Sequence, residues 1–116
     1  MTPLEELARL LRKYGHGEHA VAMASLAARE EARVEGERFW ADLAAPDVWG
    51  AEGSIAAVTL GGVTAPATPE LERDRAAYRR SLFLVAEELR LRCFESADSE
   101  RWRVRLKGEL APARRL

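Results

Sequence analysis

The chain of 116 residues is 47% hydrophobic and 32% charged, which is typical of one folded domain and excludes a disordered chain. Its net charge of −1 at pH 7 and isoelectric point of about 6.2 differ from those of a dedicated nucleic-acid-binding domain. No apolar run approaches the ~20 residues of a membrane span, and the acidic N-terminal segment lacks signal-peptide features, so we predict a cytoplasmic protein with no membrane contact.

The first predicted helix begins at Pro3. Thr2 is its expected N-cap and Glu5 its capping-box partner, because the hydroxyl and the carboxylate each accept a hydrogen bond from the other residue's backbone amide. Gly15 and Gly17 end the helical pattern. The apolar residues that recur at helical spacing within it are Leu4, Leu7, Leu10, Leu11 and Tyr14.

Two further helices are predicted before Pro46. The first spans about residues 18–35, and its many alanines favour a close approach to a neighbouring helix. The second is "ERFWADLA", in which Phe39, Trp40 and Leu43 share one side. Pro46 is expected to close this helix, because the residue before a proline is disfavoured in the helical conformation.

The octapeptide "DVWGAEGS", residues 47–54, is a candidate ligand loop. It matches neither a phosphate-binding P-loop, nor a dinucleotide fingerprint, nor a nucleophile elbow. Two interpretations remain: a simple bend, or a nest of backbone amides that binds an anion. The candidate residues are Asp47, Trp49, Gly50, Gly53 and Ser54.

The next segment, "SIAAVTLGG", is short enough to be either a strand or a turn of helix. A long helix is then predicted from Pro69 to about Phe94, with Thr68 as its N-cap. At ~1.5 Å per residue it would be about 40 Å long and would organise the domain. Its expected buried stripe is Leu71, Tyr78, Leu82, Val85, Leu89 and Cys93, which argues against an activated thiol at the chain's one cysteine.

"RWRVRLK", residues 101–107, alternates basic and apolar residues, and a period of two predicts a strand. Its basic face could bind nucleic acid phosphates, or could protect a sheet edge and complement acidic helices. Residues 1–100 carry a charge of −6, whereas residues 101–116, including Arg114 and Arg115, carry +5. The candidate basic surface is Arg101, Arg103, Arg105 and Lys107.

"HGEH" places His16 and His19 three residues apart, with Glu18 between them. Two imidazoles one helical turn apart could share a metal ion. The order of the residues does not match the H-E-x-x-H motif, and no third ligand is marked in the sequence. Two interpretations therefore remain. His16 and His19 could hold the metal of a metal-dependent enzyme, which is an alternative hypothesis for the function, or they could simply belong to the polar start of a helix.

Three segments resemble those of a group of small uncharacterised bacterial proteins. "LLRKYGHGEHA" resembles their Leu-rich first helix, "WGAEGSIAAVTL" their glycine-serine turn between helices, and "PELERDRAAYRRSLFLVAEELR" their Leu-rich terminal helix. The resemblance covers residues 5–95, while Trp49 and Glu52 around the glycines and the tail after residue 96 depart from the pattern. It implies a helical domain with no established activity; an immunity-type accessory role is a conjecture that goes with it.

These patterns predict a mostly α fold, a bundle of three to four helices with a long C-terminal helix. A minor two-stranded β element would pair residues 55–60 with 102–107. Residues 1–100 are expected to form a single helical domain, and residues 101–116 a basic C-terminal extension. The absence of Asn and Gln agrees with a thermophilic source.

The predicted function is non-catalytic protein interaction of an accessory, immunity-like kind, with a protein partner or a second copy of the chain. Trp49 and Trp102 are the predicted exposed contact residues, because tryptophan is enriched at contact hot spots; core packing is the alternative for either. Nucleic-acid binding through the basic segment is a further alternative. No catalytic residue, cofactor or metal ligand is predicted.

Overall fold

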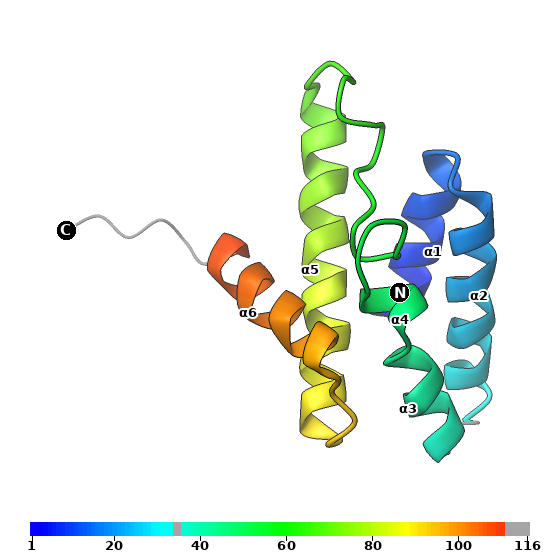
Figure 1. Cartoon of the computed structure of the whole chain (residues 1–116). Helices are drawn as coiled ribbons and strands as arrows, with labels where there is room; N and C mark the ends of the chain where they lie inside the picture. The colour runs from blue at the N-terminus through cyan, green and yellow to red at the C-terminus, as the bar shows by residue number, and fades with distance from the viewer. Residues whose placement is uncertain (34–35, 111–116) are drawn as a thin grey trace.

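The computed structural model describes residues 1–33 and 36–110, and this part of the chain forms helices without any strand (Figure 1). The mostly α prediction is confirmed, whereas the bundle of three to four helices and the two-stranded β element are not. None of the described helices has both the length and the apolar character of a membrane span. The helices are α1 (Pro3–Lys13), α2 (Gly17–Glu31), α3 (Glu37–Leu43), α4 (Pro46–Trp49), α5 (Pro69–Leu91) and α6 (Ala97–Leu110).

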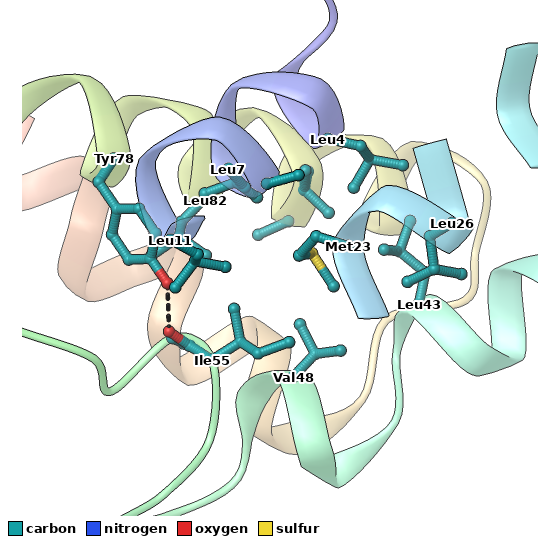
Figure 2. Close-up of a cluster of buried hydrophobic side chains, with 14 of the residues drawn as sticks. Leu4, Leu7, Leu11, Met23, Leu26, Leu43, Val48, Ile55, Tyr78 and Leu82 are labelled. Carbon is teal, nitrogen blue, oxygen red and sulfur yellow. Dashed lines mark hydrogen bonds between the residues drawn. The ribbon is translucent and has the colours of Figure 1, made fainter. Parts of the chain in front are cut away.

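The helices pack in the order α2, α1, α5, α6. α1 packs against α2 on one side and against α5 on the other, and α5 packs in turn against α6, which crosses its lower part in Figure 1. The short helices α3 and α4 lead from α2 into residues 50–68, which run beside α5 before entering it. Figure 2 shows side chains from these elements meeting in one apolar cluster, which includes Leu7, Met23, Val48 and Leu82.

Local signals at the helix starts are confirmed. The Thr2 hydroxyl accepts a hydrogen bond from the Glu5 amide (3.2 Å), and the Glu5 carboxylate accepts one from the Thr2 amide (2.8 Å). Thr68 caps α5 in the same way by accepting from the Leu71 amide (3.1 Å). Because such bonds join residues three apart, the sequence alone predicts them.

The ends of three predicted elements differ from the structure. α2 runs from Gly17 to Glu31, so the prediction is wrong at Ala32 and Arg33, which form a turn with Arg33 at a φ of 63°; predicted positions 34–35 lie outside the described residues. α3 ends at Leu43, so Pro46 does not close it but occupies the first turn of α4, where a missing amide costs nothing.

α5 ends at Leu91, earlier than predicted, and this overturns the expected burial of Cys93. Cys93 lies beyond the helix end with a φ of 63° and is exposed. Its amide donates to the Arg90 carbonyl (3.1 Å), and the Phe94 amide donates to the Leu89 carbonyl (2.8 Å). These bonds cap the last turn of α5 and turn the chain toward α6.

The strand predicted at residues 101–107 is wrong, because this segment is part of α6. Its helical spacing buries Arg103 and Leu106, at 7% and 1% exposure, and leaves Val104 61% exposed. The start is capped by Ser96, whose hydroxyl accepts from the Ser99 amide (3.0 Å). The alternation is also too short to form a ladder alone, and the proposed partner at residues 55–60 forms turns.

Side chains of α5 hold the segment that the sequence left open between strand and helix. The Tyr78 hydroxyl donates to the Ile55 carbonyl (2.6 Å; Figure 2). The Arg75 guanidinium donates to the Leu60 carbonyl from Nε (3.0 Å) and Nη2 (2.7 Å), and to the Gly62 carbonyl from Nη2 (2.9 Å). Residues 55–62 therefore form turns anchored to α5, without a ladder.

We expect the Tyr78→Phe variant to lose about 1–3 kcal/mol of unfolding free energy, because the buried Ile55 carbonyl would lose its donor. Urea unfolding followed by circular dichroism measures the loss. Tyr14→Phe is the matched control, since its hydroxyl donates to Asp74 (2.6 Å) at a half-buried site where water can replace it. Equal losses in the two variants would contradict the anchoring role of Tyr78.

A charged cluster joins the end of α1 to the start of α5. The Lys13 ammonium lies 2.6 Å from a Glu70 carboxylate oxygen and 2.7 Å from one of Asp74. Together with the Tyr14 hydroxyl, this hydrogen bond lowers the pKa of Asp74 below its ordinary value. These contacts connect the last turn of α1 with the first two turns of α5.

Candidate functional site

Two surface pockets meet at Trp102 and Arg105 of α6. The first, of about 250 Å³, lies between α5, α6 and residues 56–60. The second, of about 460 Å³, lies between α6 and the end of α4. Trp102 is half-buried and packs against the core. We call the two pockets and the side chains between them the Trp102 groove.

The helical period of α6 determines which side chains reach this groove. Arg105 lies over the Trp102 ring, with its guanidinium carbon 4.8 Å from the ring centroid. The Arg105 Nε also donates to Glu109, one turn further on (3.1 Å). Arg101, which lines the second pocket, pairs with Asp98. The groove therefore carries an aromatic ring beside two arginines, each paired with a carboxylate.

α5 supplies two more basic groups to the first pocket. Arg79 Nε lies 4.0 Å from a Glu109 carboxylate oxygen. Arg75 instead donates to the neutral carbonyls of Leu60 and Gly62. Within the described residues no carboxylate lies within 4 Å of Arg75, so its positive charge is not compensated by a direct ion pair.

The predicted ligand loop closes on itself. Ser54 is buried, and its hydroxyl donates to the Gly50 carbonyl (2.9 Å). The Ile55 amide donates to the Asp47 carbonyl (3.0 Å). A side chain on Gly50 would place its Cβ 2.6 Å from the Pro46 carbonyl oxygen, and Gly53 has a φ of 91°, so both glycines are required by the bend itself.

Trp49, predicted as an exposed contact residue, is fully buried. Its indole nitrogen donates to the Leu43 carbonyl (2.8 Å), and the side chain is 0% exposed. The cause is the turn of helix that starts at Pro46, which directs Trp49 into the core between α3 and α6. Trp49 borders the second pocket from within the core.

The remaining loop residues border a different pocket. Asp47, Gly53 and Ser54 line a hollow of about 450 Å³ together with Glu18 and His19. His16 is the N-cap residue of α2, and its side chain makes no capping bond. Over residues 1–33 and 36–110, no group of three or more His, Cys, Asp or Glu side chains is placed to hold a metal ion.

The helix also divides the predicted basic surface. Arg101 and Arg105 face the Trp102 groove, and Lys107 is exposed elsewhere on α6. Arg103, predicted to lie on this surface, is instead buried against α5. Positions 114 and 115 of the predicted basic segment lie outside the described residues.

Arg103 joins α6 to α5. It donates from Nε (2.7 Å) and Nη2 (2.9 Å) to Glu100, and from Nη1 (3.1 Å) to Glu87. The bond to Glu100 raises the pKa of Arg103 and lowers that of Glu100. A bidentate pair of this kind fixes geometry as well as charge, so Arg103 is a structural residue.

The structure thus brings together residues that the sequence placed in two separate candidates. Trp49 and Gly50 of the loop share the second pocket with Arg101 and Arg105 of the basic segment. Sequence reasoning missed the contributions of α5 and the last turn of α6. Their signal is the spacing of four between Arg75 and Arg79, and between Arg105 and Glu109, which places each pair on one helix face.

Comparisons of the chain with protein-family models, curated proteins and solved structures found no match.

Proposed function

We propose that the chain is a non-catalytic protein-binding domain whose partner binds over the Trp102 groove. The observation that carries this proposal is the half-buried Trp102 ring between two adjoining pockets, with Arg105 stacked on it. Tryptophan and arginine are the residues most enriched at energetic hot spots of protein interfaces. A large side chain held between packed neighbours loses little conformational freedom on binding.

The size and chemistry of the groove support a protein partner. The first pocket, at about 250 Å³, is smaller than the roughly 300–1,000 Å³ of most small-molecule sites and suits one side chain of a partner. The second pocket, at about 460 Å³, falls within that range, so the size argument applies to the first pocket alone. The Tyr78 hydroxyl, which lines the first pocket and could serve as a proton donor, donates a hydrogen bond to the Ile55 backbone carbonyl. It therefore has a structural role.

The partner is a different protein or a second copy of the chain. An accessory, immunity-type role in a bacterial cytoplasm is the biological setting that we propose with it, on the resemblance of residues 5–95 alone. Light scattering separates the two kinds of partner, because a second copy doubles the mass from 12.9 kDa.

A photo-reactive benzoylphenylalanine at position 101, which lines the second pocket and leaves Trp102 in place, tests the proposal when introduced in the native host. We expect it to crosslink a defined partner that the same group at Val21, exposed on α2, does not reach. The purified partner should bind Trp102→Ala at least about tenfold more weakly than the unmodified chain. Equal binding by a folded Trp102→Ala variant would contradict the proposal.

A further inference from the structure

Positive charge in the first pocket of the Trp102 groove exceeds the negative charge placed beside it. Arg75, Arg79 and Arg105 line this pocket, and Glu109 is the carboxylate that lines it with them. Arg105 and Arg79 lie 3.1 Å and 4.0 Å from Glu109, whereas Arg75 donates to neutral carbonyls only. This local excess occurs in a chain whose net charge is −1.

We propose that the first pocket binds a carboxylate of an acidic peptide segment of the partner, between Arg75, Arg79 and Arg105 and beside the Trp102 ring. The inference rests on the proposed function and names the chemistry of the partner at the same site. Guanidinium groups pair with carboxylates through two parallel hydrogen bonds, so converging arginines select this group over a neutral one.

Glu109 occupies the position of the ligand carboxylate when the pocket is empty. Its side chain is 38% exposed, and its two arginine partners are 42% and 63% exposed. Exposed ion pairs of this kind contribute little to stability, because water competes for both charges. A partner carboxylate can therefore replace Glu109, which acts as a weak internal competitor.

An acidic peptide fits the surroundings better than a nucleic acid. A phosphate backbone needs a continuous basic stripe, but on α6 Asp98 and Glu109 flank Arg101 and Arg105 and pair with them, and Arg103 is turned toward α5. The pocket volume of about 250 Å³ accommodates a single side chain. Recognition of an acidic motif by clustered arginines is one of the recurring modes of peptide binding.

Selection of a displayed library of random 12-residue peptides on the full chain tests the inference. We expect the selected peptides to be enriched in Asp and Glu and to bind less tightly as salt is raised. Arg79→Gln and Arg105→Gln should each weaken the best peptide at least about fivefold. Glu109→Gln should strengthen it roughly two- to fivefold, because the competitor is removed.

The chain contains a matched control for these variants. Arg92 lies over the Trp40 ring, 4.9 Å from its centroid, and its Nε donates to Glu88 four residues before it (2.9 Å). This arrangement repeats that of Arg105, Trp102 and Glu109, but lies outside the groove. Glu88→Gln and Arg92→Gln should leave peptide affinity within about twofold.

The outcomes separate the two proposals. Selected peptides that need Trp102 but carry no acidic enrichment, or that bind Arg79→Gln and Arg105→Gln unchanged, overturn the carboxylate inference and leave the proposed function standing. Selection of no peptide sensitive to Trp102→Ala overturns both. Tighter binding of a 12-nucleotide single-stranded DNA than of the best peptide overturns the choice of an acidic peptide.

Discussion

The Trp49→Ala variant is expected to lose about 3–5 kcal/mol of unfolding free energy. Trp49 is fully buried, so truncation leaves a large cavity at the point where α3, α4 and α6 meet. It also leaves the Leu43 carbonyl without its indole donor. Domains of this size have only about 5–15 kcal/mol of stability, so the variant would lose much of its margin.

Urea unfolding followed by circular dichroism measures this loss, and Trp102→Ala is the control. Trp102 is half-buried and its ring borders two pockets, so its truncation should cost less than about 2 kcal/mol while weakening partner binding. The two variants thus separate a core tryptophan from a contact tryptophan. If Trp49→Ala kept its full stability, Trp49 would not be a core residue, and its role as a ligand-binding residue of the 47–54 loop would again be the better explanation.

Leu106→Ala is expected to lose about 2–5 kcal/mol, whereas Val104→Ala should change stability by less than about 0.5 kcal/mol. Leu106 is 1% exposed against α5, and Val104 is 61% exposed on the opposite side of α6. In a strand, residues 104 and 106 would share one face, and both truncations would be costly. The comparison therefore tests helix against strand directly.

The measurement is the urea midpoint of unfolding of each variant. The urea dependence of the unfolding free energy checks that unfolding is two-state. A Val104→Ala loss as large as that of Leu106→Ala would show that residues 102–106 pack with a period of two. The native α6 would then be excluded, together with the Trp102 groove that depends on it.

Helices α1 and α5 could be predicted because their signals are local. The capping box of Thr2 and Glu5 and the cap at Thr68 act over three residues. The apolar stripes repeat over several turns, so one misread position such as Cys93 does not change the assignment. The end of α5 differs from the prediction, because a C-terminal cap depends on a single residue, here Cys93, adopting a positive φ.

Helix α6 could not be predicted from the alternation of basic and apolar residues at 101–107. These seven residues are compatible both with a strand, whose side chains repeat every two residues, and with a helix, whose side chains repeat every 3.6. A strand places Arg103 on the outer, basic face, whereas the helix places it against Glu100 and Glu87. Glu87 lies sixteen residues away on another helix, and no local pattern reveals that pairing. The alternation therefore predicts a surface group at Arg103, whereas the structure buries this side chain against α5 and pairs it with two half-buried carboxylates.

The amino-acid sequence by itself determined the helical class, the N-terminal caps of α1 and α5, most of their buried faces, and the bend at Gly50, Gly53 and Ser54, because these depend on interactions within one or two turns. The tertiary structure alone decided that residues 55–62 form turns held by Arg75 and Tyr78, that α6 is a helix, and that Trp49 is core while Trp102 borders a groove. Those outcomes depend on packing between elements distant along the chain, where burial outweighs local preference.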